Sequence, residues 1–403
     1  MNLTNIINCP KCKKEIKVEE LHTDGQRLTD GIISCLNCKY KSIIYQGIII
    51  NTDTENNRKS IEFFNEKYNK EIDLGFEEKA FYSNFVEENQ LKTTKKHFSK
   101  IKIFLNMLYY VTVIIILYFY SLISKKDKNT LKTEIELLAE VYHYVPEMAI
   151  QKLIEMRVIK DNIPEKELGV ILDIGGGNGI VTGTLLKDYN VKSKINVDLF
   201  ASFSETYDFI ISEDISKSMI KDNLVDTGLS ICVFEHIPNA TYLLKDIYSK
   251  LNNDGIFAFT TPKSEYYKGL FLYRILHLFS KKYAQRYAEF DIKHSSHCSL
   301  YEEEFLKNEI LKARFKNVTA IPFYSKNQLL LFDCLNVCAK LPRDWHFWGI
   351  WQTFFWKKKF FKRIMISLLK IILYRVNETC NNKKNNKFYT HFLYVCKKGG
   401  IKA

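Results

Sequence analysis

The middle of this chain alternates short apolar runs with helical stretches. Five of the runs have the length and composition of β-strands. They lie at residues 170–173, 194–199, 208–212 and 255–262, with one more running from Leu229 into Glu235. A helix is expected directly after the first run, at residues 180–188. Strands that alternate with helices predict an α/β domain, and 403 residues are enough for one such domain with additional segments.

A glycine-rich turn follows the first strand, in the sequence V-I-L-D-I-G-G-G-N-G. Asp173 ends the apolar run, and Gly175, Gly177 and Gly179 alternate after it. Glycines at this spacing let the backbone turn tightly and pass close to a ligand. Asp198 ends the next strand, 21 residues beyond Gly177, where a carboxylate can accept ribose hydroxyls. A nicotinamide-binding domain would show G-x-G-x-x-G instead, and it leaves the later E-H-I-P sequence unexplained.

Together these motifs resemble the E-H-I branch of class I S-adenosylmethionine (SAM) methyltransferases, over roughly residues 146–323 plus a final strand at 388–397. The resemblance implies a Rossmann-like sheet of seven strands, the sixth at residues 317–323. It also implies SAM as the cofactor, with Asp198 at the ribose and Asp214 at the adenine amino group. The residues that the resemblance assigns to SAM are Asp173, Gly175, Gly177, Gly179, Asp198 and Asp214.

Glu235 and His236 follow the fourth strand, where ligands of open α/β sheets bind. A base at this position could deprotonate an acceptor hydroxyl, although the pair can be purely structural in this family. His297 matches the family's later histidine better than His294 does, and it is a third catalytic candidate. Its alternative role is to open a helix. The segment 262–300 is expected to cover the substrate, with many of its side chains in ordinary core packing.

Residues 1–50 carry two C-x-x-C pairs, Cys9 with Cys12 and Cys35 with Cys38. Four thiolates close a tetrahedral zinc site without an open position, so the metal is expected to be structural. Four unligated thiols are the alternative. This segment, with a strand expected at residues 40–50, resembles the small zinc-ribbon proteins that activate methyltransferases.

Residues 51–145 are expected to form a mainly helical linker with an uncharged run of 21 residues, 103–123. This run is long enough to span a bilayer. Lysines on both sides leave its orientation undefined by the positive-inside rule. A single crossing would separate the ribbon from the methyltransferase domain, so we favour a re-entrant or interfacial helix or a helix hairpin. A helix buried in the fold is the alternative.

The methyltransferase domain is expected at residues 146–403, with a basic insertion at 325–387 where a short hairpin is usual. An apolar run follows its lysines at residues 364–374. The four tryptophans of the chain lie in this insertion, at Trp345, Trp348, Trp351 and Trp356. On a helix they would cover an arc of about 140°. This combination favours an interfacial membrane helix, and the alternative is an aromatic cap or a partner surface.

The net charge of +13 is concentrated around the two apolar segments, because residues 92–132 carry a net +8 and residues 340–387 a net +10. Basic residues beside apolar runs suit an anionic membrane surface. We therefore expect a SAM-dependent methyltransferase for a small-molecule, lipid or lipid-linked glycan acceptor at the cytoplasmic membrane face. The ten cysteines and the lack of a signal peptide fit a reducing cytoplasm.

Two other functions remain as alternatives. An RNA methyltransferase would use the ribbon and the basic segments on the phosphate backbone. However, no D/N-P-P-Y/F motif follows the fourth strand. The other alternative is a non-catalytic ribbon protein that acts as a scaffold.

Overall fold

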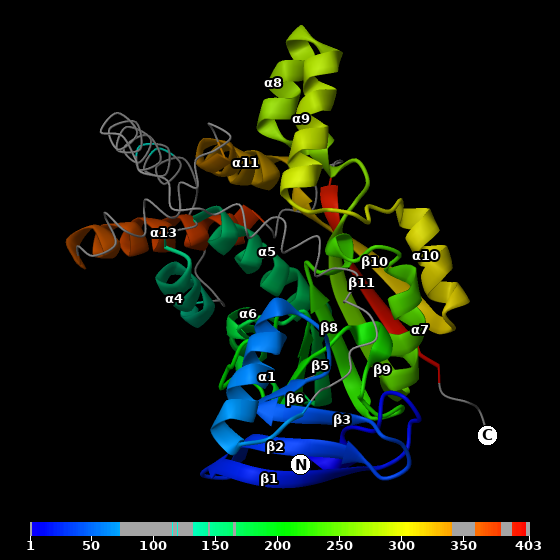
Figure 1. Ribbon diagram of the computed structural model, residues 1–403. Helices are drawn as coiled ribbons and strands as arrows, with labels where there is room; N and C mark the ends of the chain where they lie inside the picture. Colours follow the sequence, from blue (N-terminus) through cyan, green and yellow to red (C-terminus); the bar gives the residue numbers. More distant parts are fainter. Residues whose placement is uncertain are drawn as a thin grey trace.

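The computed structural model describes residues 2–72, 115, 119, 132–143, 146–163, 167–340, 359–379 and 389–399 (Figure 1). The strands of this part of the chain are β1 (Ile16–Asp24), β2 (Arg27–Cys35), β3 (Lys41–Tyr45), β4 (Ile48–Ile50), β5 (Glu167–Ile174), β6 (Asn190–Asp198), β7 (Phe209–Ser212), β8 (Val225–Ile231), β9 (Leu251–Pro262), β10 (Phe315–Ser325) and β11 (Tyr389–Lys398). They form one sheet in the order β1-β2-β3-β4-β7-β6-β5-β8-β9-β11-β10. The expected seven-stranded sheet is thus extended to eleven strands.

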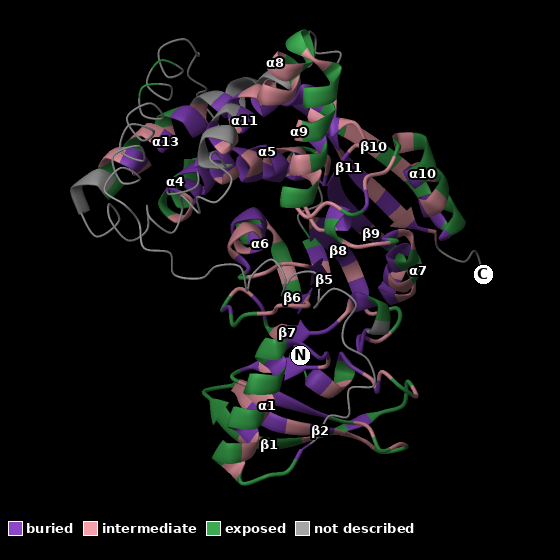
Figure 2. Ribbon diagram, turned by 45° about the horizontal axis from the view of Figure 1, so that its top comes forward, coloured by how far each residue is buried: buried purple, intermediate pink, exposed green. Residues whose placement is uncertain are grey.

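Helices cover this sheet on both faces (Figures 1 and 2). The described helices are α1 (Glu55–Tyr68), α4 (Lys132–Val141), α5 (Pro146–Asn162), α6 (Ile180–Leu185), α7 (Thr241–Lys250), α8 (Phe271–Phe279), α9 (Lys281–His294), α10 (Glu303–Lys312), α11 (Lys326–Lys340) and α13 (Lys359–Thr379). The short 3₁₀ turns are η1 (Leu3–Asn5), η2 (Leu186–Asp188), η3 (Ile215–Lys217), η4 (Phe234–His236) and η5 (Tyr266–Gly269). The helix expected at residues 180–188 therefore ends as a 3₁₀ turn after Leu185.

Five parallel strands, β7-β6-β5-β8-β9, form the centre of the sheet. Successive side chains of a strand point to opposite faces, so a strand covered on both sides is apolar throughout. On β5, Ile171 packs in one core with helices α4, α5, α11 and α13. Its neighbours Val170 and Leu172 pack in the second core, with α7, α10 and the N-terminal segment. The carboxyl ends of β5, β6 and β8 therefore lie along one edge, where a ligand site is expected.

The N-terminal ribbon continues the central sheet. Its β4 pairs in parallel with β7, with Ile48 opposite Ile210 and Ile50 opposite Ser212. The single strand expected at residues 40–50 is wrong, because β3 and β4 form a hairpin. Gln46 and Gly47 both have positive φ values, of +50° and +76°, which matches the turn that best fits a two-residue hairpin.

β10 forms the far edge of the sheet, away from the ribbon. β11 inserts antiparallel between β9 and β10, and the insertion between β10 and β11 contributes α11 and α13. The apolar run 364–374 packs against the protein along one face, and contact of this insertion with a membrane stays a prediction. This run forms part of α13, whose residues Leu369, Ile372 and Leu373 are fully buried in the protein core. The tryptophans of the insertion lie outside the described residues.

A helical hairpin of α8 and α9 projects from the body of the molecule (Figure 1). Its base is fixed to α11, where Asp333 accepts hydrogen bonds from the Leu272 backbone N–H at 3.2 Å and the Tyr287 hydroxyl at 3.4 Å. Of the apolar run 103–123, only Ile115 and Phe119 lie within the described part. Among the described helices, none combines the length and apolar character that a membrane crossing requires.

Candidate active site

The loop between β5 and α6 has a conformation that glycine adopts without strain. Gly175, Gly177 and Gly179 have φ values of +74°, +54° and +73°. Any other L-residue with such a positive φ would destabilise the folded protein by about 1–2 kcal/mol per position. Three alternating glycines at these positions therefore match the backbone conformation directly, as the sequence spacing predicted.

The surroundings of these glycines show that two of them pack against the protein and one borders open space. A Cβ on Gly175 would lie 2.5 Å from the Val233 side chain, and one on Gly179 would lie 2.6 Å from the Tyr207 ring. Both glycines let the loop pack against the protein. A Cβ on Gly177 would meet no atom within 4 Å. The backbone of Gly177 consequently borders open space, into which a ligand can fit.

Asp173 lies underneath the loop and is 1% exposed. Its carboxylate accepts hydrogen bonds from the Thr182 and Tyr207 hydroxyls. Burial raises the pKa of Asp173 to about 6, against the opposing effect of these two hydroxyls. Gly176 is also needed here, because a Cβ would lie 2.3 Å from the Asp173 carboxylate. Asp173 and its partners therefore hold the loop in place.

Asp198 joins the end of β6 to the glycine loop. Its Oδ2 accepts from the Gly177 backbone N–H at 2.9 Å, and its Oδ1 accepts from the Phe200 N–H at 2.8 Å. Burial raises the pKa of Asp198, and these two hydrogen bonds act in the opposite direction. The carboxylate lies beside the open space at Gly177, where it can accept hydroxyl groups of a ligand.

Asn196 holds the glycine loop in position, and the sequence analysis did not single it out. It is fully buried, and its Oδ1 accepts from the Gly176 N–H at 3.2 Å. Its Nδ2 donates to the Gly177 carbonyl at 3.2 Å. The signal for it was a polar residue within the apolar second strand, two residues before Asp198.

Asp214 follows β7 and is half-buried. Its Oδ1 accepts from the backbone N–H of Ser216 at 2.9 Å, so in this structure it caps η3. The preceding acid, Glu213, is buried and accepts from the Asn51 side chain of the ribbon at 2.9 Å. Burial raises the pKa of Glu213 to about 7. The ribbon therefore supports the turn on which the predicted adenine-binding acid lies.

Glu235 and His236 lie on η4, beyond the end of β8. Glu235 is 2% exposed, and its Oε2 has no hydrogen-bond partner among the described residues. Burial is the main cause that raises the pKa of Glu235 to about 8. The His236 Nε2 lies 3.9 Å from Glu235 Oε1, and burial lowers the pKa of this histidine. A buried carboxyl oxygen without a partner, such as Glu235 Oε2, is unusual for a purely structural residue.

The third candidate, His297, comes to the same place from a distant segment. Its ring centroid lies 5.3 Å from that of His236. Backbone N–H groups of Cys298 and Ser299 donate to the Glu235 carbonyl at 2.8 and 3.0 Å, which holds the turn after α9 against η4. The structure therefore brings Glu235, His236 and His297 together.

A buried charged network lies next to these candidates. Lys152 of α5 donates to the Glu155 carboxylate at 3.0 Å, and the Cys232 thiol donates to the other oxygen of Glu155 at 2.5 Å. Cys232 has a φ of +56°, a strained value for a cysteine, at the end of β8. Lys152 and Glu155 neutralise each other, so their net field on Glu235 is small.

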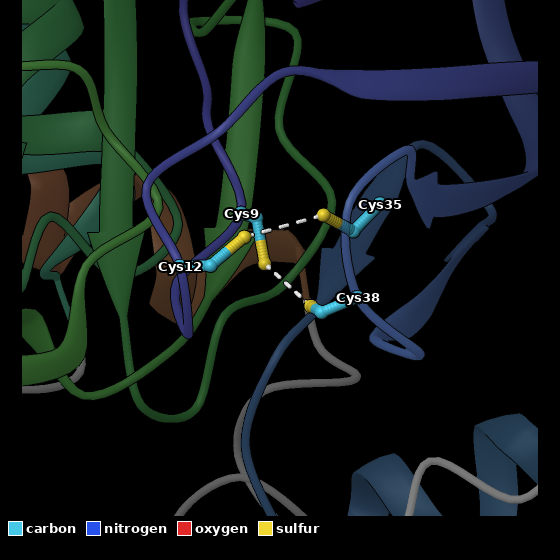
Figure 3. Close-up of side chains that lie close together, drawn as sticks. All are labelled: Cys9, Cys12, Cys35 and Cys38. Carbon is cyan, nitrogen blue, oxygen red and sulfur yellow. Dashed lines mark hydrogen bonds between the residues drawn. The ribbon is translucent and has the colours of Figure 1, made fainter.

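The four cysteines of the ribbon converge on one point, although their two pairs come from separate turns (Figure 3). The sulfur atoms of Cys9 and Cys38 lie 3.6 Å apart, and those of Cys12 and Cys35 lie 3.4 Å apart. Tetrahedral coordination with metal–sulfur bonds of about 2.3 Å places sulfur atoms about 3.8 Å apart. The arrangement of the four thiols therefore fits a metal ion.

Comparison with known proteins points to one enzyme class. Residues 143–320 match a family model described as a methyltransferase domain. No sequence among the curated proteins matches this chain.

Solved structures of methyltransferases are similar only at a low level. One is phosphoethanolamine N-methyltransferase 2 of Haemonchus contortus, at 14% identity and a TM-score of 0.38, with 61% of this chain and 52% of that chain covered. The present chain thus spans about half the length of that enzyme. Another is a complex of the Haloferax volcanii Trm112 methyltransferase activator with a methyltransferase, at 12% identity, a TM-score of 0.36, and 65% and 97% coverage.

A SAM-dependent methyltransferase of Archaeoglobus fulgidus matches at 15% identity and a TM-score of 0.32, with 60% and 94% coverage. These values are too low to transfer an acceptor from any of the three. The matched domain nevertheless contains the glycine loop with Asp198 beside its open face, and the strand order expected around it. Residues 143–320 of this chain therefore form a domain of the methyltransferase type.

Proposed function

We propose that this methyltransferase acts on a small-molecule, lipid or lipid-linked glycan acceptor at the cytoplasmic face of a membrane. The observation that carries the proposal is the apolar tip of the α8–α9 hairpin. At this tip Leu278 is 83% exposed, Phe279 84% and Tyr283 59%. Apolar side chains gathered at the end of a projecting element are typical of an interaction site.

Basic side chains surround the tip. Arg274, Lys281, Lys282 and Arg286 are exposed on the two helices, and Glu289 is the exposed acid on the same hairpin. Apolar side chains bordered by lysine and arginine suit the interface of an anionic bilayer. The hairpin follows β9 and η5 directly, so a bilayer at its tip would lie on the acceptor side of the sheet.

One group of residues would bind the cofactor, and another would position the acceptor. SAM supplies an electrophilic methyl group, which is transferred in line to a nucleophile. The loop glycines, Asp173, Asp198 and Asp214 would hold and orient the cofactor. Glu235 and His236 follow β8, the parallel neighbour of β5, and His297 lies beside them, so the three would position the acceptor and take a proton from it.

The ribbon would hold a structural zinc ion on Cys9, Cys12, Cys35 and Cys38. Four sulfur ligands leave no position for substrate, so the metal would stabilise the ribbon without taking part in the chemistry. Since β4 pairs with β7, a folded ribbon would also support the SAM-binding edge of the domain.

Flotation of the full-length protein with vesicles tests the membrane part. Replacing Leu278 and Phe279 by serine removes roughly 2–4 kcal/mol of apolar insertion, so binding to anionic vesicles should fall about 30-fold or more. The matched control replaces Leu311 and Phe305 on α10 by serine, since these are also exposed, at 53% and 48%. Equal vesicle binding by both double variants would overturn the membrane assignment. Salt-sensitive binding to RNA in place of vesicles would favour the RNA alternative.

A further inference from the structure

We propose that Glu235, His236 and His297 bind a divalent transition-metal ion. This would be a second metal centre, separate from the four cysteines and located on the acceptor side of the glycine loop. Carboxylate and imidazole groups are common ligands of such ions. One ligand atom from each of the three residues lies within 4.8 Å of the other two.

The first support for the site is the environment of Glu235. This side chain is buried, and its Oε2 has no hydrogen-bond partner among the described residues. A buried carboxylate oxygen without a partner costs roughly 1–3 kcal/mol or more. A bound cation would remove this cost, and Lys152 is not available to do so because it is paired with Glu155.

The second support is the orientation of the two imidazole rings. The Nδ1 of His236 lies 3.1 Å from the Ser296 carbonyl oxygen, which can only accept, so Nδ1 carries the proton. In the neutral ring, Nε2 then presents its lone pair on the side of Glu235. A metal-binding histidine usually donates its other ring N–H to an oxygen in this way.

His297 follows the same pattern. The Tyr266 hydroxyl donates to the Asp291 carboxylate at 2.7 Å and therefore accepts from the His297 Nδ1 at 3.1 Å. The lone pair of His297 is thus on Nε2 as well. Tyr266 and Asp291 are both buried, which fixes this hydrogen-bonded chain in one arrangement. Two histidines oriented by oxygen acceptors, with the Glu235 carboxyl group beside them, offer three ligands of the types that transition-metal ions bind.

The geometry requires only a small contraction. Metal–ligand bonds of about 2.1 Å at tetrahedral angles place ligand atoms about 3.4 Å apart, so each side chain would move by roughly 1 Å or less. His236 is 40% exposed and has room for this movement. Three protein ligands leave a position open, as in catalytic metal sites, and an oxygen atom of the acceptor can fill it. This role in the reaction rests on the proposed function, whereas the metal binding does not.

Equilibrium dialysis of the full-length protein against Zn²⁺ tests the site by metal count. We expect two zinc ions per wild-type chain, one on the cysteines and one on this cluster. Glu235→Gln, which keeps the side-chain shape, and His297→Ala should each weaken the second site by roughly 100-fold, and Tyr266→Phe by about 10-fold. His277→Ala, an exposed histidine on α8, is the matched control and should retain two.

Replacing the bound zinc by Co²⁺ and recording the visible absorption spectrum gives a second measurement. Co²⁺ in a nitrogen–oxygen site shows visible d–d bands without the sulfur charge-transfer band that thiolates produce. The proposal is overturned if the wild type binds one zinc ion only, or if Glu235→Gln and His297→Ala, both retaining SAM binding, still bind two. Failure of methyl transfer with two zinc ions bound would instead contradict the proposed function.

Discussion

The Asn51 amide donates a hydrogen bond to the buried Glu213 carboxylate at 2.9 Å, and this contact joins the ribbon to the methyltransferase domain. It continues the pairing of β4 with β7, since the Asn51 backbone N–H also donates to the Ser212 carbonyl at 2.9 Å. Asp214, the residue after Glu213, is the one that the sequence resemblance predicts to bind adenine. One short turn therefore connects the ribbon to the predicted cofactor site.

Replacing Asn51 by alanine should lower both stability and SAM affinity. One donor to a buried carboxylate disappears, which costs about 1–3 kcal/mol in the free energy of unfolding. Urea unfolding measures the first effect and calorimetric SAM titration the second. The control is Asn308→Ala, on an exposed position of α10. If both variants unfolded at the same urea concentration, the connection described here would be wrong.

Glu213 should make stability depend on pH. Its pKa is raised by burial from 4.5 to about 7 in the folded protein. The folded state therefore holds its proton more strongly, and this contribution to stability is complete below about pH 4.5. As the pH rises to about 7, this contribution should be lost, which lowers the free energy of unfolding by about 3 kcal/mol. The difference in unfolding free energy between the wild type and Glu213→Gln, measured across this range, should show this trend, and a constant difference would contradict it.

Gly177 and Gly175 should respond differently to alanine. At Gly177 the added Cβ meets no protein atom, so the strained φ alone should cost about 1–2 kcal/mol, while SAM affinity falls at least tenfold. At Gly175 the Cβ collides with Val233, so the protein itself should be destabilised more strongly. Thermal unfolding and SAM titration of the two variants separate these effects. Unchanged SAM affinity in a folded Gly177→Ala protein would place the cofactor elsewhere.

Loss of one ribbon cysteine should destabilise the N-terminal part of the chain. Cys12→Ser removes a ligand of the proposed zinc site, and zinc binding contributes directly to the folding of small ribbons. A lower zinc content and a lower unfolding temperature are expected. Lys39→Ser is the matched control, because Lys39 is an exposed residue of the ribbon next to Cys38 and offers no thiol. Equal zinc content in the two variants would show that the four thiols do not bind the ion.

The central sheet and the glycine loop could be predicted because their signals are local. Strand periodicity and the positive φ values of Gly175, Gly177 and Gly179 depend on neighbouring residues only. The same holds for Asp198, which follows its strand at a fixed distance. Asn196 was missed because its role appears only when β6 lies beside the loop.

Long-range contacts explain the other differences. The pairing of β4 with β7 joins segments about 160 residues apart, and no local sequence pattern predicts such a pairing. The packing of the apolar run 364–374 could not be predicted because its partners on α4 and α5 are distant in sequence. Glu235, His236 and His297 were each found separately, but their convergence depends on the turn after α9.

Transfer of labelled methyl groups tests the central claim most directly. Full-length protein and methyl-labelled SAM are incubated with separate membrane and soluble extracts, and the labelled fraction is measured. Asp198→Asn is the control, because it weakens the carboxylate that orders Gly177 and should lower transfer by at least tenfold. We predict label in the membrane fraction with the wild type, and little with the variant. Label in RNA, or equal labelling by both proteins, would contradict this account.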